Sequence, residues 1–135
     1  MTTTNYNPAK RYFWDDYIFL VVEDEIVNYK FIELTLKKSG SKVLHAKTGR
    51  EAIDICNSER KIDIILMDIE LPEINGYDAV IEIRKSRPDI LIIAQTAYAM
   101  KSQKDKCFEV GCNDYIAKPY SSGDLMEIIC KYIEN

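Results

Sequence analysis

The sequence has few of the residues that mark specialised protein classes. Its 135 residues include only 5 glycines, 4 prolines, 1 histidine and 4 cysteines, and no two cysteines form a C-x-x-C pair. This composition excludes collagen-like, low-complexity and zinc-ribbon chains. The first residues lack the apolar core of a secretion signal, and no apolar run in the sequence is long enough to cross a bilayer. We therefore expect a cytoplasmic globular domain that makes no membrane contact.

Cysteine placement and net charge exclude further classes. We interpret the four cysteines as small buried side chains in a reducing compartment, with a redox pair of Cys107 and Cys112 as the alternative. The formal net charge is −4, and the sequence contains no long basic stretch. Such a chain attracts a nucleic-acid backbone only weakly, so we expect no direct binding to DNA or RNA.

Five apolar runs alternate with stretches of helical character. The runs cover residues 17–22, 42–46, 62–68, 89–95 and 113–118. Helix signals follow each run, such as Val27, Phe31 and Leu34 at helical spacing after the first. Alternating strands and helices predict a doubly wound, flavodoxin-like α/β fold, in which helices cover both faces of a five-stranded parallel sheet. We assign residues 17–135 to this domain and residues 1–16 to an N-terminal extension or linker.

Polar residues stand at the ends of four of the five runs. Glu23 and Asp24 follow the first run, Asp68 ends the third, Thr96 follows the fourth, and Lys118 ends the fifth. Parallel strands end at one edge of the sheet, so these side chains should meet there. Clustered carboxylates repel one another unless a cation joins them, and an all-oxygen ligand set favours Mg²⁺. Lys118 and Thr96 suit phosphoryl oxygens, which leaves Asp68 as a nucleophile able to form an acyl phosphate.

Four motifs at these strand ends resemble those of a known family. VVEDE, LMDIELPEINGYDA, AQTAYA and NDYIAKPY occur in the order found in the CheY-like receiver domains of response regulators, and the resemblance runs from about Tyr17 to Glu134. It implies the strand order 2-1-3-4-5 and a two-component phosphorelay in which Asp68 accepts a phosphoryl group from a histidine kinase or phosphotransfer protein. It also implies Mg²⁺, with no further cofactor. The implied metal ligands are Glu23, Asp24, Asp68 and the backbone carbonyl of Glu70.

The resemblance implies further roles within the site. Thr96 and Lys118 would contact the phosphoryl oxygens, and Thr96 and Tyr115 would act as the switch. Glu70 lies two residues past the acceptor, where side chains of this family crowd the phosphoryl group and tune its lifetime. Pro119 implies a cis peptide bond after Lys118. The fourth helix, fifth strand and fifth helix would form the readout face and support a phosphorylation-dependent dimer.

Other functions and arrangements remain open from sequence. A Mg²⁺-dependent aspartyl-phosphate phosphatase of the haloacid-dehalogenase type would need an aspartate where Glu70 stands. An unphosphorylated interaction module would not need all the site positions to be filled. We expect an acceptor that catalyses its own phosphorylation and dephosphorylation rather than an enzyme acting on a separate substrate. The flank YFWDDYIFLVVEDEIVNYKF resembles receivers of hybrid histidine kinases, which include membrane-bound sensors with a cytoplasmic part, and a stand-alone regulator is the alternative.

Overall fold

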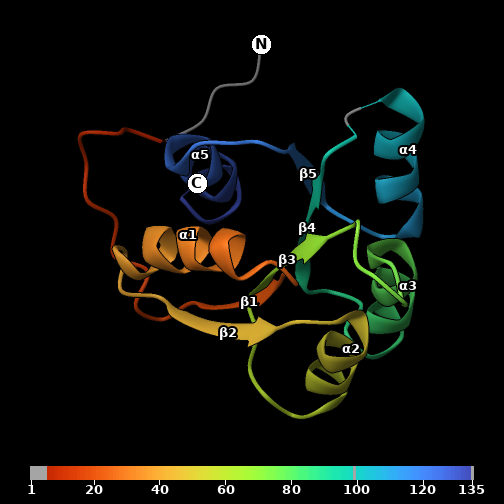
Figure 1. Cartoon of the computed structure of the whole chain (residues 1–135). Coiled ribbons are helices and arrows are strands. Elements are labelled where there is room, and N and C mark those ends of the chain that lie inside the picture. Colours follow the sequence, from red (N-terminus) through yellow and green to blue (C-terminus); the bar gives the residue numbers. More distant parts are fainter. Residues whose placement is uncertain (1–5, 99, 135) are drawn as a thin grey trace.

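A five-stranded parallel sheet lies at the centre of the computed structural model, which describes residues 6–98 and 100–134 (Figure 1). The strand order is β2-β1-β3-β4-β5, so the predicted topology is confirmed. The strands are β1 (Ile18–Val22), β2 (Lys42–Ala46), β3 (Ile64–Asp68), β4 (Leu91–Thr96) and β5 (Asp114–Ala117). The central strands β1, β3 and β4 are almost entirely buried, as expected for a parallel sheet covered on both faces.

Helices cover the two faces of the sheet in two groups (Figure 1). On one face lie α1 (Ile26–Lys37) and α5 (Ser122–Ile133). On the other face lie α2 (Gly49–Asn57), α3 (Gly76–Ser86) and α4 (Lys101–Val110). Side chains of Thr48, Asn75 and Ser121 accept backbone N–H groups at the starts of α2, α3 and α5 and so cap these helices. Among the described residues, none of the helices is long and apolar enough to cross a membrane.

The apolar residues whose spacing predicted α1 do not face the sheet. Val27, Phe31 and Leu34 are 74%, 37% and 64% exposed, so their spacing predicted the helix but not its buried face. The residues of α1 that are buried are Tyr29, Ile32, Thr35 and Leu36. The helix α1 carries apolar residues on two sides, and periodicity alone does not tell which side meets the sheet.

The segment before β1 packs against α1 and α5. Tyr12 and Trp14 are 4% and 1% exposed and belong to the same core cluster as these two helices. The backbone N–H of Trp14 donates to the Ser39 carbonyl at 2.7 Å, and its indole Nε1 donates to Glu134 Oε2 at 2.9 Å. A domain boundary at residue 17 stays a prediction, and these contacts place part of the preceding segment within the packed core.

All four cysteines are buried and free of disulfides. Burial raises the pKa of Cys56 to about 11 and that of Cys112 to about 12. The thiols therefore remain protonated near neutral pH, which favours the interpretation as small apolar side chains over reactive ones.

Candidate functional site

The ends of β1 and β3 bring three carboxylates together. Val22 pairs with Met67 across these strands, so the next residues, Glu23 and Asp68, lie side by side. Glu23 and Asp68 are 1% and 2% exposed, whereas Asp24 is exposed. The side-chain ligand oxygens of the three acids lie within 4.8 Å of one another. Two of the three are thus held away from water at the edge where sequence placed them.

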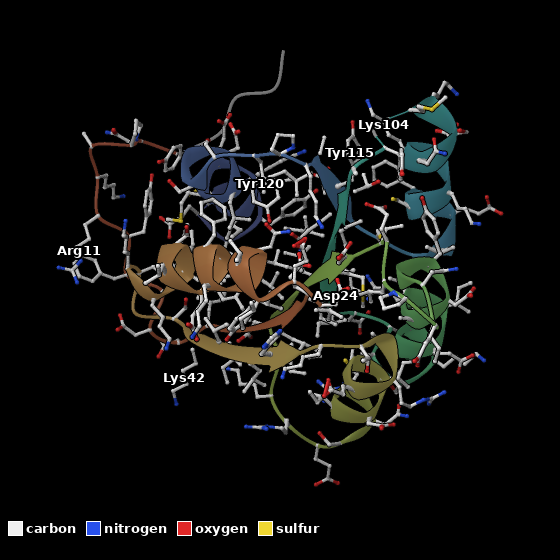
Figure 2. The ribbon with its side chains drawn as sticks, viewed as in Figure 1. Arg11, Asp24, Lys42, Lys104, Tyr115 and Tyr120 are labelled. Atoms are coloured by element: carbon white, nitrogen blue, oxygen red, sulfur yellow. The ribbon has the colours of Figure 1, made fainter. Side chains whose placement is uncertain are left out.

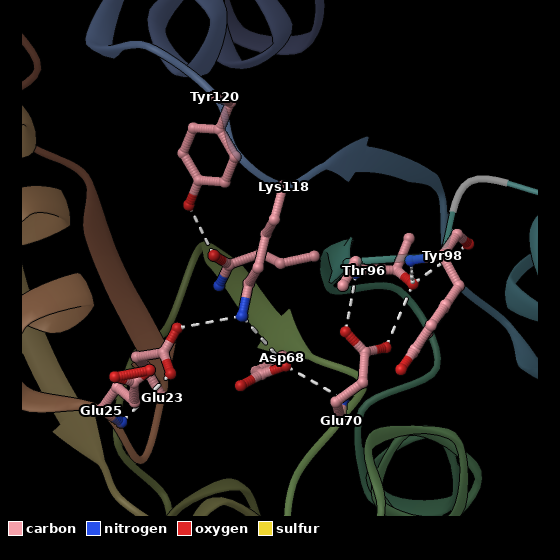
Figure 3. Close-up of polar contacts among 10 residues, drawn as sticks. Glu23, Glu25, Asp68, Glu70, Thr96, Tyr98, Lys118 and Tyr120 are labelled. Atoms are coloured by element: carbon pink, nitrogen blue, oxygen red, sulfur yellow. Dashed lines mark hydrogen bonds and ion pairs between the residues drawn. The ribbon is translucent and has the colours of Figure 1, made fainter.

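Lys118 extends between two of these acids (Figure 3). Its Nζ lies 3.4 Å from Glu23 Oε1 and 3.3 Å from Asp68 Oδ1. Its backbone N–H donates to the Thr96 carbonyl at 2.8 Å, which holds the end of β5 against β4. The peptide bond between Lys118 and Pro119 is cis, as the resemblance implied. Burial alone would lower the pKa of Lys118, but the Asp68 and Glu23 carboxylates outweigh it and raise that pKa, so the ammonium stays charged.

The acidic cluster is short of positive charge. Burial raises the pKa of Glu23 to about 7, and the neighbouring Asp68 carboxylate contributes to the rise. The Glu25 backbone N–H, which donates to Glu23 Oε2 at 3.2 Å, and the Lys118 ammonium act in the opposite direction. One ammonium does not balance three carboxylates, and hard oxygen donors at this spacing suit a divalent cation such as Mg²⁺. The residues present therefore fit the metal that the sequence implied.

Thr96 is connected to Asp68 through Glu70. Thr96 is buried at the end of β4, and its hydroxyl donates to Glu70 Oε2 at 3.1 Å. The Ala97 backbone N–H donates to Glu70 Oε1 at 2.7 Å. The Glu70 backbone N–H in turn donates to Asp68 Oδ1 at 2.9 Å. Figure 3 shows the Glu70 side chain reaching from the loop after β3 toward Thr96, to one side of Asp68.

Tyr115 lies on β5 and is turned toward α4. Its ring packs edge-on to Phe108 at 6.1 Å between centroids, and Lys104 Nζ lies 5.0 Å from its ring centroid. Figure 2 shows Tyr115 beside Lys104. This arrangement joins the predicted switch aromatic to the exposed side of α4, and its role as a switch stays a prediction.

Two supporting contacts carried no signal in the sequence. The His45 ring Nε2 lies 2.8 Å from the Glu23 backbone oxygen, and because that oxygen only accepts, Nε2 carries the donated hydrogen. The same ring stacks on Tyr29 at 3.6 Å between centroids. On the other side of the acidic cluster, the Tyr120 hydroxyl donates to Gln95 Oε1 at 2.5 Å. Each contact joins residues far apart along the chain, so local pattern does not reveal it.

Comparison with known proteins gives a family and two relatives. The model described as response regulator receiver domain matches residues 19–130. Hybrid signal transduction histidine kinase I of Dictyostelium discoideum is 40% identical over 127 residues, which cover 85% of this chain but only 7% of the kinase. The polar-differentiation response regulator DivK of Brucella anthropi is 36% identical over 120 residues, which cover 84% of this chain and 94% of the regulator. The relatives thus include both a hybrid kinase and a stand-alone regulator.

Solved structures share the fold. The receiver domain of sensor histidine kinase PA1611 from Pseudomonas aeruginosa PAO1, with a magnesium ion coordinated in its active-site cleft, has a TM-score of 0.80 and 36% identity, covering 88% of this chain and 98% of that one. A chain of the co-crystal of the Saccharomyces cerevisiae phosphotransfer protein Ypd1 with the Ssk1 receiver domain has a TM-score of 0.76 and 28% identity, covering 87% of this chain and 93% of that one. With its sheet order, its strand-end acids and these matches, the chain belongs to the response regulator receiver family.

Proposed function

We propose that Asp68 is the phosphoryl acceptor of a two-component phosphorelay. The observation that carries this proposal is the position of its carboxylate, buried at the end of β3 with Oδ1 3.3 Å from Lys118 Nζ and beside the Glu23 and Asp24 acids. A buried carboxylate on a rigid strand is a well-oriented nucleophile.

The proposed reaction moves a phosphoryl group from a phosphohistidine to Asp68. A carboxylate oxygen attacks phosphorus, the new P–O bond forms as the P–N bond breaks, and the departing imidazole nitrogen keeps the electron pair and takes up a proton. Lys118 would balance charge on the phosphoryl oxygens, and the Thr96 hydroxyl and Ala97 N–H would donate to them. Water attacking the same phosphorus would release phosphate and restore Asp68. The domain would thus catalyse its own phosphorylation and dephosphorylation.

The reaction would use Mg²⁺. Glu23, Asp24, Asp68 and the backbone carbonyl of Glu70 would hold the ion, which would supply positive charge beside the phosphoryl oxygens. The oxygen-only cluster and the magnesium in the PA1611 receiver cleft support this assignment.

The proposed donor is a histidine kinase or a phosphotransfer protein. Exposed Ile26 and Val27 lie at the start of α1, where only Glu25 separates them from the acidic pair of Glu23 and Asp24. Beside Lys118 lies a cavity of about 340 Å³. Its other lining residues are Asn28, Phe31, Gln95, Ala97, Pro119 and Tyr120. A donor helix that buries this apolar surface would bring its histidine next to Asp68, and the Ypd1–Ssk1 co-crystal supports a partner of this kind.

The proposed cellular location is the cytoplasm, including the cytoplasmic part of a membrane-bound hybrid kinase. A donor histidine takes its phosphoryl group from ATP, which is present there, and four free thiols suit a reducing compartment.

The proposed readout is a phosphorylation-dependent dimer through α4, β5 and α5. Phe108 on α4 is 49% exposed beside Tyr115 and would lie in this interface.

Intact-mass analysis after incubation with acetyl phosphate and Mg²⁺ tests the proposal. The wild-type chain should gain one phosphoryl adduct that is lost with chelator, whereas Asp68→Asn should gain none because the nucleophilic oxygen is removed. Asp54→Asn, a change of an exposed aspartate on α2, should behave as wild type. An adduct on Asp68→Asn, or none on the wild type, would contradict the proposal. Turnover of a generic phosphate ester would favour the phosphatase alternative.

A further inference from the structure

The side chain of Glu70 makes two hydrogen bonds that are separate from the proposed metal binding by its backbone carbonyl. Its Oε2 accepts the Thr96 hydroxyl at 3.1 Å, and its Oε1 accepts the Ala97 backbone N–H at 2.7 Å. We call this pair of hydrogen bonds the Glu70 latch. The latch joins the loop after β3 to the end of β4 (Figure 3). An anionic group with two oxygens thus already holds two of the donors placed beside Asp68.

Each of these donors has a single hydrogen to give. The Ala97 N–H points to Glu70 Oε1, and the Thr96 hydroxyl is shared between Glu70 Oε2 and the Tyr98 carbonyl at 3.2 Å. A hydroxyl or an amide N–H cannot make a full hydrogen bond to the Glu70 carboxylate and to a phosphoryl oxygen at the same time. Occupation of these donors by Glu70 and by a phosphoryl group is therefore mutually exclusive.

The latch is of a kind that opens readily. Glu70 and Ala97 are both exposed, so water replaces the hydrogen bond between them when the carboxylate swings away. The Thr96 hydroxyl is buried, and in the open state it keeps the Tyr98 carbonyl as its acceptor.

The Lys118 ammonium pairs with Glu23 and Asp68, so its charge is used there and does not hold the Glu70 carboxylate in the latch. A phosphoryl group on Asp68 would also repel the Glu70 carboxylate, since both are anions. Closed and open states should therefore be close in free energy, with the anion at Asp68 favouring the open one.

We propose that Glu70 is an internal competitor that sets the affinity of the acceptor site for phosphoryl groups. Its carboxylate occupies the Thr96 and Ala97 donors while Asp68 is unmodified, and an incoming phosphoryl group binds these donors only by displacing it. This inference rests on the proposed function, because it assigns the two donors to phosphoryl oxygens. It gives the Glu70 side chain a function separate from that of its backbone carbonyl.

Binding of beryllofluoride, a phosphoryl mimic, measures the competition in the presence of Mg²⁺. Calorimetric titration would compare the wild type with Glu70→Ala and with Glu73→Gln. Glu73 lies in the same loop, and its carboxylate makes no hydrogen bond or ion pair within the described part of the chain. Glu70→Ala should bind about tenfold more tightly if the latch is closed in about 90% of molecules. Glu73→Gln should bind as the wild type does.

Glu70→Asp separates competition from simple charge. The shorter side chain keeps the negative charge but cannot reach both donors from the same backbone position. The latch predicts that Glu70→Asp also binds beryllofluoride more tightly than the wild type. Wild-type affinity in Glu70→Asp, together with equal tightening in Glu70→Ala and Glu73→Gln, would show that only charge matters and would overturn the proposal.

The Ala97 amide reports on the latch directly. A hydrogen bond to a carboxylate shifts the amide proton downfield and slows its exchange, so Glu70→Ala should move this signal upfield and speed the exchange before any anion is added. Thermal unfolding confirms that each variant is folded. If neither wild type nor variants bind beryllofluoride or accept a phosphoryl group, the proposed function fails. If all do so with equal affinity, only the latch fails.

Discussion

The two sides of the candidate site hold their charges in different ways. On the side of β1 and β3, Glu23 and Asp68 are buried and share the ammonium of Lys118. On the side of β4, Glu70 is exposed and bonds to Thr96 and to a backbone N–H. The first side keeps charge out of water at a cost in free energy, and the second makes contacts that water or another anion replaces. We call them the buried side and the exposed side.

This difference separates two tasks. Under the proposed function, the buried side would hold the nucleophile, a cation and the metal in fixed positions, which is what in-line transfer requires. The exposed side would hold two donors whose partner changes with the state of Asp68. Variants on the buried side should therefore alter stability, whereas those on the exposed side should alter anion affinity and leave stability nearly unchanged.

The largest expected effect on stability comes from removing the shared cation. Lys118→Met leaves two buried carboxylates without their ion pair, and we expect a loss of about 2–3 kcal/mol in the free energy of unfolding at pH 7.5 in chelator. Lys101→Met, which breaks an exposed pair with Asp105, should cost less than about 0.5 kcal/mol. Urea unfolding measures both. Equal losses of unfolding free energy in Lys118→Met and Lys101→Met would show that the buried ion pairs contribute no more to stability than an exposed one.

A smaller effect should appear as a pH dependence. The pKa of Glu23 is raised from 4.5 to about 7 in the fold, so between these values the folded chain binds more protons than the unfolded one. The contribution of Glu23 to stability is then fully present below about pH 4.5 and is lost as pH rises through 7. Glu23→Gln cannot lose this proton. Its stability relative to wild type should therefore grow by about 1–3 kcal/mol from pH 5 to 7.5 in chelator. A constant difference in urea unfolding across that range would contradict the assigned pKa.

The smallest effect is expected on the exposed side. Glu70→Ala should change the free energy of unfolding by less than about 0.5 kcal/mol, because water replaces its bond to the exposed Ala97 N–H and the Thr96 hydroxyl keeps the Tyr98 carbonyl as its acceptor. Urea unfolding at pH 7.5 in chelator, with Glu73→Gln as the control, measures this. A loss comparable to that of Lys118→Met would place Glu70 among the groups that hold the fold together.

Sequence was most informative where local pattern decides position. The buried run of β3 and its terminal Asp68 were predictable, because a strand covered on both faces must be apolar until it reaches the edge of the sheet. It was least informative for α1, where exposed Val27 and buried Ile32 are equally apolar. The choice between them depends on how the helix lies on the sheet, which spacing does not contain.

The contacts around the acidic site were beyond prediction for another reason. His45 meets the Glu23 carbonyl and Tyr120 meets Gln95 only because the strands bring distant residues together. The Glu70 side chain was expected near the phosphoryl group, but its hold on the β4 donors depends on loop and side-chain torsions that its residue type leaves free. Sequence thus placed the candidate reacting groups at one edge of the sheet, and the fold determined their hydrogen-bond partners.

The hydrogen bond between Trp14 and Glu134 has a topological consequence. It joins residues separated by 120 positions along the chain, so the polypeptide enters and leaves the packed core at one place beside α5 (Figure 1). The two ends of the packed domain therefore lie close together. If the domain were inserted between two segments of a longer polypeptide, it would protrude from that polypeptide and add little to the distance between the two segments.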